Sequence, residues 1–344
     1  MTPSAPRGRI APAPSIEDVA RLAGVSAQTV SRVSRDAPNV RPTTRQRVLD
    51  AMNQLGYAPN RAARALRSGT FRTIGVITQN PERTGENLIT AGIASAAESR
   101  GYSVALMRVS HPETGDLQEA GVRLGQQTID GLIIVQAGGA DRGSLLLPTS
   151  LPVVVSDSRL INDYPSVVAD QDRGVRDVMA HLISLGHRSI AHIAGPDDSR
   201  SALQRAAAWR SCLHEAGLPE GPLLPGDWSA HSGYRAGLRL VDEHPGATAV
   251  LCANDESAFG AIRALHERHR RVPDDVSVTG FDGIPLSEFC SPPLTTAHLD
   301  FPAIGAGLVD LLLSRIGSPA PSLERRIVPA SLVVRDSTGP APSR

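Results

Sequence analysis

The sequence predicts an α/β protein in which an N-terminal all-α helix-turn-helix head precedes a two-lobed body of doubly wound parallel sheets. Two patterns support this prediction. Apolar residues spaced three and four apart indicate short helices before residue 58, and after residue 70 seven apolar runs alternate with helical stretches. The chain has 344 residues, which is enough for about two to three domains of ~150 residues each.

These patterns divide the chain into five segments. We expect a disordered tail over 1–14, a helix-turn-helix domain over 15–58, a hinge helix over 59–70, the two-lobed body over 71–337 and a tail over 338–344. The net charge of the whole chain is zero, but residues 1–70 carry 11 Arg against four acids, a net of +7, which leaves −7 on the remainder. A basic head on an acidic body favours contact between the head and a polyanion.

The head begins with two short helices. Ser15 and Asp18 form the S-x-x-D pattern of a capping box, and the apolar spacing that follows predicts a helix over 16–23. After a tight connection at glycine, Ser26 can cap a second helix over 27–33. Two short helices joined by such a turn are typical of a helix-turn-helix.

A third helix and a shorter fourth one follow. Pro42 is a good first-turn residue and Gly56 a good residue just past a helix end, which predicts a helix between them. Asn60 can cap the hinge helix RAARALR. At about eight residues, that helix is too short to persist alone in water.

The body alternates strands with helices. Continuous Val, Ile and Leu runs indicate strands buried on both faces, hence parallel sheets covered by helices. The strand-like runs are TIGVIT (73–78), YSVALMRV (102–109), DGLIIV (130–135), PVVVSD (152–157), SIAHIAG (189–195), AVLCAN (249–254) and VSVTGFD (276–282). Ligands of open α/β sheets bind beyond the carboxyl ends of strands, which singles out Asp157, Asn254 and Asp282. We interpret the nearby Asp255 as a helix N-terminal acid and leave it out of the site.

Five motifs in this order resemble the LacI/GalR family of transcriptional repressors over about residues 15–337. They are IEDVARLAGVSAQTVSRV, LGYAPNRAARALRSG, GHRSIAHIAGP, CANDESAFGAI and GFDGIPLSEFCSPPLTT. The resemblance implies a periplasmic-binding-protein-like body that binds an effector and dimerises. It also implies a sequence-specific DNA-binding repressor whose affinity for double-stranded operator DNA is controlled by a small molecule.

The second helix is expected to read the DNA major groove. Its exposed face carries Gln28 and Arg32, and Gln pairs with adenine and Arg with guanine, each pair discriminating by roughly 1–3 kcal/mol. Ala27 offers contact with a thymine methyl group. The hydroxyl side chains expected on phosphates are Ser26, Thr29 and Ser31. The alternative for Gln28 and Arg32 is a solvated surface pair on a small helix.

The hinge is expected to enter the minor groove. Ala63 and Leu66 fall on one face of the short helix that Asn60 caps, with arginines around it. By resemblance, Leu66 is the leucine lever that inserts with its dimer mate at the centre of a near-palindromic operator. The alternative for Leu66 is ordinary packing against the body. The chain ends without a leucine heptad or a tetramerisation helix, which predicts a homodimer.

The effector site combines strand ends with residues implied by resemblance. The expected contacts are Asp157, Ser201, Arg205, Trp228, Asn254, Asp282 and Phe301. Carboxylate and amide groups suit sugar hydroxyls, and an aromatic face suits the C–H patch of a sugar ring. We therefore expect a mono- or disaccharide, and Trp228 favours one that acts as an inducer. The alternative for Trp228 is core filling, whereas Trp209 is expected in the core.

Some residues depart from the family pattern. Gly283 stands where the family often has a second Asp, Leu299 stands where a lactose-responsive member has a polar residue, and the stretch TQNPERTGENL is more polar than in lactose-type members. The exact sugar therefore stays unidentified. A non-sugar co-repressor such as a purine is the alternative within the family.

Other classes of protein fit less well. The three cysteines are far apart, the first 14 residues lack an apolar core, and no run approaches the ~20 apolar residues that cross a bilayer. We expect a cytoplasmic protein with no membrane contact, no metal, no cofactor and no catalytic residue. A cytoplasmic sugar-binding protein or an enzyme is the alternative of another class, but the common nucleophile, zinc and phosphate motifs do not occur.

Overall fold

The structure is a computed structural model that describes residues 14–35, 37–57, 70–110, 116–126, 129–135, 151–317 and 323–343. The chain divides into two compact units, Met1–Phe71 and Arg72–Arg344. This division lies one residue from the predicted boundary between hinge and body. The predicted hinge helix and nearly all of the predicted N-terminal tail fall outside the described residues.

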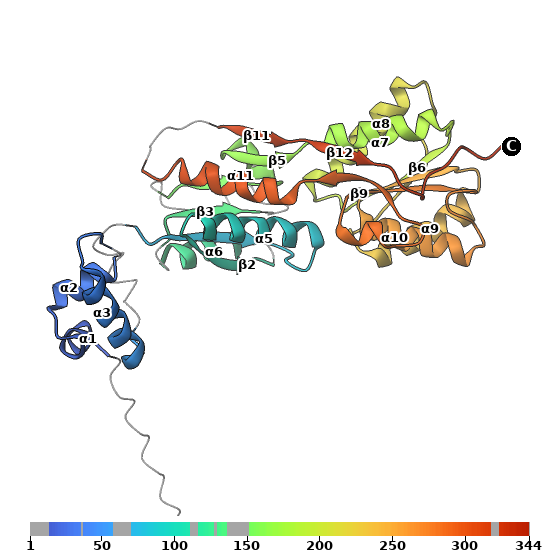
Figure 1. Cartoon of the computed structure of the whole chain (residues 1–344). Helices are drawn as coiled ribbons and strands as arrows, with labels where there is room; N and C mark the ends of the chain where they lie inside the picture. The colour runs from blue at the N-terminus through green and yellow to red at the C-terminus, as the bar shows by residue number, and fades with distance from the viewer. Residues whose placement is uncertain are drawn as a thin grey trace, which may run out of the picture. The chain divides into compact units, whose positions relative to one another are not determined.

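The first unit contains the three predicted helices of the head. They are α1 (Ile16–Ala23), α2 (Ala27–Val33) and α3 (Pro42–Leu55) (Figure 1). Ser15 and Asp18 form the predicted capping box at α1, and the Ser26 hydroxyl accepts from the Thr29 amide at the start of α2, 3.2 Å away. Gly56 ends α3 with a positive φ of 63°. The helix-turn-helix prediction is confirmed, and α1 and α2 have the predicted bounds.

The core of the head is aliphatic. Val19 and Val48 are fully buried, and Val30 and Val33 on α2 pack with them. The side of α2 that carries these two valines is thereby fixed against α1 and α3. The opposite side of α2 is left for contact with other molecules.

The second unit contains two lobes, each built on a six-stranded sheet. The sheet of the first lobe has the order β11-β5-β4-β3-β1-β2. Its strands are β1 (Thr73–Thr78), β2 (Ser103–Arg108), β3 (Gly131–Ile134), β4 (Val153–Val155), β5 (Ser166–Ala169) and β11 (Arg325–Val328). The helices of this lobe are α5 (Thr84–Ser99), α6 (Asp116–Gln126), the 3₁₀ helix η3 (Arg159–Asn162) and α11 (Phe301–Leu313).

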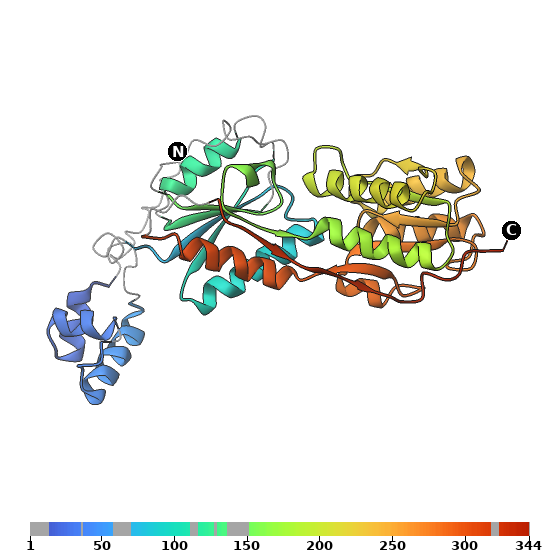
Figure 2. The same ribbon diagram turned by 90° about the horizontal axis from the view of Figure 1, so that it is seen from above.

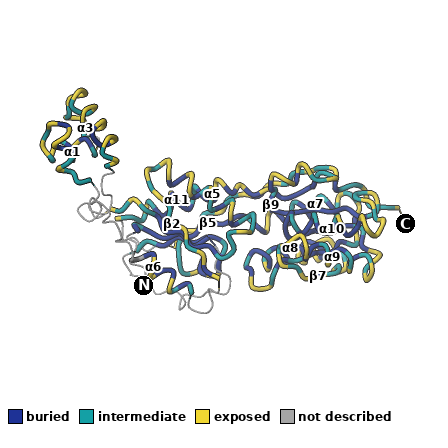
Figure 3. Tube along the Cα trace, turned by 90° about the horizontal axis from the view of Figure 1, so that it is seen from below, coloured by how far each residue is buried: buried dark blue, intermediate teal, exposed yellow. Residues whose placement is uncertain are grey.

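The sheet of the second lobe has the order β12-β10-β9-β8-β6-β7. Its strands are β6 (Ile190–Ile193), β7 (Leu223–Leu224), β8 (Ala249–Cys252), β9 (Ser277–Asp282), β10 (Thr295–Leu299) and β12 (Ala330–Val333). Its helices are α7 (Gln171–Ser184), α8 (Arg200–Glu215), α9 (Ala230–Glu243), α10 (Asp255–Glu267) and the 3₁₀ helix η4 (Pro285–Glu288). The central strands of both sheets are buried (Figure 3).

Three connections join the lobes. The chain passes from β5 to α7, returns from β10 to α11, and crosses again from β11 to β12 (Figure 2). Within the first lobe, α11 packs closely on α5. The two helices approach at Gly305 and Gly92, where a Cβ at Gly305 would lie only 2.6 Å from the Gly92 carbonyl carbon. The predicted two-lobed architecture is therefore confirmed, and its lobes meet where these connections cross.

The structure corrects three expectations for the body. The strand β2 is an edge strand rather than one buried on both faces, and its Leu106 is 52% exposed. The sheets are not wholly parallel, because β12 runs antiparallel to β10. The expected tail packs on the second lobe, where the Ala341 amide donates to the Leu185 carbonyl oxygen at 2.9 Å and the Thr338 hydroxyl lies 2.9 Å from a ring nitrogen of His181.

In the parts of the chain that the structure describes, no helix is long and apolar enough to span a membrane.

Candidate functional site

The candidate DNA-reading surface lies on α2. Gln28 and Arg32 are exposed on the side of the helix opposite Val30 and Val33. Ala27, Thr29 and Ser31 are half-buried, whereas Ser26 is exposed. Because the Ser26 hydroxyl also accepts from Thr29, its position is fixed by the helix cap. The remaining predicted DNA contacts, Asn60, Ala63 and Leu66, lie outside the described residues.

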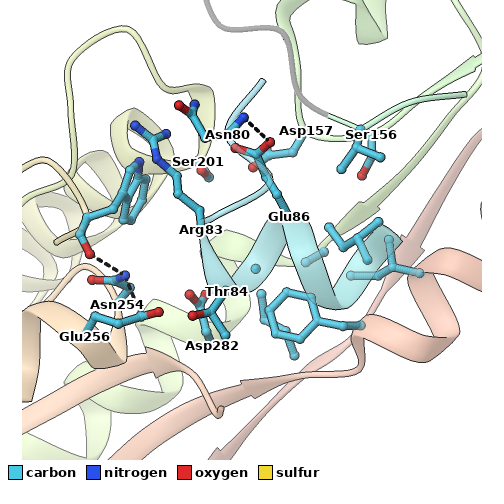
Figure 4. Close-up of a pocket in the computed structure, with 18 of the residues that line it drawn as sticks. Asn80, Arg83, Thr84, Glu86, Ser156, Asp157, Ser201, Asn254, Glu256 and Asp282 are labelled. Carbon is cyan, nitrogen blue, oxygen red and sulfur yellow. Dashed lines mark hydrogen bonds between the residues drawn. The ribbon is translucent and has the colours of Figure 1, made fainter. Parts of the chain in front are cut away.

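The candidate effector site is a cavity of about 370 Å³ between the two lobes. We call it the interlobe cavity. Walls are contributed by the ends of several strands and by the N-terminal turns of α5, α8 and α11 (Figure 4). All seven predicted effector contacts line it, namely Asp157, Ser201, Arg205, Trp228, Asn254, Asp282 and Phe301. The structure therefore brings together residues that are up to 144 positions apart, from Asp157 to Phe301.

Arg205 is the centre of the second-lobe wall. Its guanidinium donates from Nε to Gln171 Oε1 at 2.8 Å and from Nη2 to Asp282 Oδ1 at 3.0 Å, and Nη1 donates to the Ala253 carbonyl oxygen. The charged group also lies 3.8 Å from the centroid of the Phe281 ring. Arg205 is only 4% exposed. These contacts hold the guanidinium in one orientation and present Asp282 beside it.

Asp282 ends β9 with an unusual backbone. Its φ is 101°, while Asp157 and Trp228 have φ of 22° and 73°. Positive φ in three non-glycine residues around one cavity is the kind of local strain that collects at ligand sites. Burial raises the pKa of Asp282 to about 6, although the charge of Arg205 opposes this rise. The carboxyl group can therefore change its charge near neutral pH.

Asn254 positions Trp228. Its Oδ1 accepts from the Ser257 amide at 3.1 Å, which caps α10, and its Nδ2 donates to the Trp228 carbonyl oxygen at 2.9 Å. The same Nδ2 donates to Glu256 at 2.8 Å. The side chain of Asn254 is thus engaged within the protein, and its best-supported role is to hold the loop that carries the indole.

The first-lobe wall carries Asp157. This carboxylate lies 3.7 Å from Arg200 Nη1 on the second lobe. Ser201 is buried, with its hydroxyl 3.0 Å from that of Ser199. Phe301, at the start of α11, is 5% exposed and supplies an apolar surface.

Asp255 lies outside the cavity, as expected. It is fully buried, accepts from the Ile284 amide at 2.8 Å and from the Thr296 hydroxyl at 2.6 Å, and has a raised pKa because of its burial. Trp209 is fully buried in the core, also as expected.

The sequence patterns did not identify Glu86 and Gln171, which also line the cavity. Gln171 follows β5. The sequence of this strand, SVVA, is short and begins with a polar residue, so it does not form a recognisable apolar run. Had β5 been recognised, the rule of strand ends would have included Gln171. Glu86 has the pattern of an ordinary acid in the first turn of a helix, so nothing in the sequence distinguishes it.

Comparison with known proteins identifies the family. The model for the lacI family of bacterial regulatory proteins matches residues 15–60, and that for a periplasmic binding protein-like domain matches residues 179–338. The lactose operon repressor of Escherichia coli (strain K12) is 37% identical over 330 residues, which cover 94% of this chain and 90% of that protein. The chain belongs to the lacI family of bacterial regulatory proteins.

Other lacI-family proteins match over the same length. The HTH-type transcriptional repressor PurR of Histophilus somni (strain 129Pt) is 33% identical over 329 residues, covering 94% of this chain and 98% of its own. The solved structure of a lac repressor dimer bound to operator and the anti-inducer ONPF has a TM-score of 0.84 and 36% identity, with 94% of this chain and 99% of that chain covered. A complex of the transcriptional regulator CelR with cellobiose has a TM-score of 0.71 and 30% identity, with the same coverage.

Membership of the lacI family confirms the predicted recognition and fold class. The chain is a DNA-binding transcriptional repressor of this family, and its curated relatives are repressors and control proteins rather than enzymes.

Proposed function

We propose that this lacI-family repressor acts in the cytoplasm as a homodimer on a near-palindromic operator, and that a sugar bound in the interlobe cavity induces its release from DNA. The observation that carries the effector part is the joint presence of Arg205, Asp282 and Trp228 in one cavity. A polar ion pair beside an indole provides both hydrogen bonds for hydroxyl groups and an apolar face for a sugar ring.

The size of the cavity supports a small ligand. Its volume of about 370 Å³ lies within the range of roughly 300–1,000 Å³ that is usual for small-molecule sites. Phe301 and Leu299 add apolar surface to a lining that also contains many polar groups. This mixture fits a mono- or disaccharide, and the cellobiose complex of a relative provides a precedent in the family.

The DNA part of the proposal rests on the exposed side of α2. Gln28 and Arg32 are free to face base edges because the valines of the same helix are committed to the core. In this proposal the hydroxyl groups of Ser26, Thr29 and Ser31 contact phosphates. Asn60 begins the hinge helix, and Ala63 and Leu66 enter the minor groove where the two hinge helices of the dimer meet.

Control by the sugar follows from coupling between the two sites. A sugar that favours the lobe arrangement in which the hinges separate weakens operator binding, typically by about 1–3 kcal/mol. By thermodynamic reciprocity, operator DNA weakens sugar binding by the same factor. Equal sugar affinities with and without operator would contradict this mechanism.

The sugar assignment is tested by a thermal-shift screen of mono- and disaccharides, with hypoxanthine and guanine in parallel. A sugar that stabilises the protein should bind at least tenfold more weakly to Trp228→Ala, because the ring loses its apolar cover. A purine that stabilises the protein in the absence of any sugar hit would overturn the carbohydrate assignment.

The DNA assignment is tested by selection of binding sites from random duplexes, followed by binding at several salt concentrations. Gln28→Ala should relax the preference at one base pair in each half-site while retaining the salt dependence that phosphate contacts produce. Gln46→Ala is the matched control, because Gln46 is exposed on α3 and bonds only Asp50 among the contacts described. An unchanged preference in Gln28→Ala would remove this residue from base recognition.

A further inference from the structure

Glu86 is a buried carboxylate that the proposed function does not use. It is the third residue of α5, is 4% exposed and lines the interlobe cavity from the first lobe. Burying a carboxylate is costly unless its oxygens are hydrogen-bonded. The contacts of its two oxygens therefore indicate what the residue does.

One oxygen of Glu86 is fully engaged. Oε2 accepts from the Thr78 hydroxyl at 2.6 Å, from the Asn80 amide at 2.8 Å and from the Gln79 amide at 3.2 Å. Figure 4 shows the bond from Asn80. These three donors come from the end of β1 and the turn that follows it. They anchor the carboxylate and fix the direction of its other oxygen.

The other oxygen has no partner. Oε1 is buried and makes no hydrogen bond with any described residue. The carboxylate also lacks an ion pair within the described chain, whereas Asp157 and Asp282 of the same cavity lie 3.7 Å and 3.0 Å from arginine nitrogens. A role in anchoring the turn explains Oε2 but leaves Oε1 unexplained.

The charge of the cavity restricts what Oε1 can bind. The carboxylates in the lining are Glu82, Glu86, Asp157, Asp227, Glu256 and Asp282, and the guanidiniums are Arg83 and Arg205. An excess of negative groups in a site of low dielectric repels anions and favours neutral or cationic ligands. An ionised carboxylate oxygen can only accept a hydrogen bond.

We infer that Glu86 is a specificity-determining residue of the effector cavity, whose Oε1 accepts a hydrogen bond from an O–H or N–H group of the effector. The inference rests on the proposed function, which it deepens. It assigns the effector to neutral or amino-substituted polyhydroxylated compounds and excludes sugar phosphates. Two sources of the donor are compatible with this chemistry, a hexose hydroxyl and a hexosamine ammonium group.

The substitution Glu86→Gln separates the anchor from the ligand contact. The three donors around Oε2 require an oxygen, so the glutamine oxygen takes that position and its NH₂ group replaces Oε1. The variant keeps the turn but presents a donor to the cavity in place of an acceptor. Glu98→Gln is the matched control, because it removes the same charge from the same helix at an exposed residue that does not line the cavity.

The test is isothermal titration of the full-length protein and both variants with glucose, galactose, lactose, cellobiose, glucosamine and glucose 6-phosphate. For a sugar that binds the unaltered protein, Glu86→Gln should bind at least tenfold more weakly, about 1.4 kcal/mol, while Glu98→Gln stays within about twofold. Monodeoxy analogues then identify the hydroxyl whose removal weakens the unaltered protein but not Glu86→Gln. An advantage of glucosamine over glucose that disappears in Glu86→Gln identifies the ammonium group instead.

The outcomes distinguish this inference from the proposed function. Equal affinities of the unaltered protein and Glu86→Gln, with both folded by circular dichroism, would overturn the role of Glu86 and leave the sugar assignment intact. Glucose 6-phosphate binding as tightly as glucose would overturn the exclusion of anions. If none of these sugars binds the unaltered protein, the carbohydrate assignment fails, and with it the polyhydroxylated class inferred here.

Discussion

Asp157 and Arg200 form an ion pair that joins the two lobes, with 3.7 Å between the carboxylate Oδ1 and Nη1. Asp157 follows β4 of the first lobe, whereas Arg200 is the first residue of α8 in the second. The two side chains are only 20% and 22% exposed. The pair lies beside the interlobe cavity, so the spacing of the lobes and the occupancy of the cavity act on the same contact.

Loss of this pair should weaken sugar binding. Asp157→Asn and Arg200→Gln should each lower the affinity for the sugar found in the screen about threefold to tenfold, because closure of the lobes loses one attraction. The double variant should lose little more than either single one, which is the signature of residues in contact. Titration of the four proteins measures this coupling. Losses that simply add would show that the pair does not connect the lobes energetically.

Sugar binding should also depend on pH through Asp282. Burial raises the pKa of this carboxyl from 3.8 to about 6, with the charge of Glu256 adding to the rise and that of Arg205 opposing it. Above this value the carboxylate accepts hydrogen bonds from hydroxyl groups, and below it one oxygen is protonated. We expect affinity for the sugar to fall as the pH is lowered through 6. Titrations from about pH 8 to pH 5 measure the fall.

The effect of this carboxyl on folding has the opposite direction. Because its pKa is higher in the folded chain than the reference value of 3.8, its contribution to stability is fully present below that value and is lost as the pH rises through 6. Asp282→Asn should bind sugar weakly at every pH. In this variant, neither the affinity for sugar nor the free energy of unfolding should show the pH dependence that the Asp282 carboxyl produces. A pH profile of sugar binding that is unchanged in Asp282→Asn would assign the titration to another group.

Trp228 should become more mobile when Asn254 no longer donates to its carbonyl oxygen. Asn254→Asp retains an oxygen that caps α10, since Asp and Asn are comparable caps, but it loses both Nδ2 contacts, at 2.9 Å to Trp228 and 2.8 Å to Glu256. In a Trp209→Phe background, Trp228 is the one indole left. Its emission should shift to longer wavelength and acrylamide quenching should increase. Asn87→Asp, which changes an exposed amide in the same way, should leave both signals unaltered.

Much of the architecture follows from continuous apolar runs, and what was missed has identifiable causes. The central strands β1, β3, β8 and β9 are recognisable in the sequence as continuous apolar runs, because both of their faces are buried. The strands β11 and β12 lie at the ends of their sheets, where burial is incomplete, and their short sequences RRIV and ASLV form no continuous apolar run. Strand β10, with the sequence TTAHL, contains polar side chains whose hydrogen bonds are made to distant segments such as Asp255 and Arg335.

The candidate site was predictable to the same extent. Residues such as Asp157, Asn254 and Asp282 directly follow apolar runs, so their meeting at one cavity follows from the rule of strand ends. Glu86 was not predictable, because its burial depends on the Thr78 hydroxyl and two backbone amides that approach only in the folded chain. Local sequence contains no information about such an approach.

The departure from the family pattern at Gly283 has a physical reason that a substitution can test. Its φ is +67°, and a Cβ there would lie 2.6 Å from Nδ1 of His298. Gly283→Ala should therefore carry two penalties, the left-handed backbone at about 1–2 kcal/mol and a clash at about 1–3 kcal/mol. Gly217 has a φ of +65°, and no atom lies within 4 Å of the position that a Cβ would take there, so Gly217→Ala should carry the first penalty alone. Denaturant unfolding followed by tryptophan fluorescence measures both, because Trp209 and Trp228 belong to the same lobe. Equal losses in the two variants would show that His298 moves aside without cost and that the close approach does not explain the glycine.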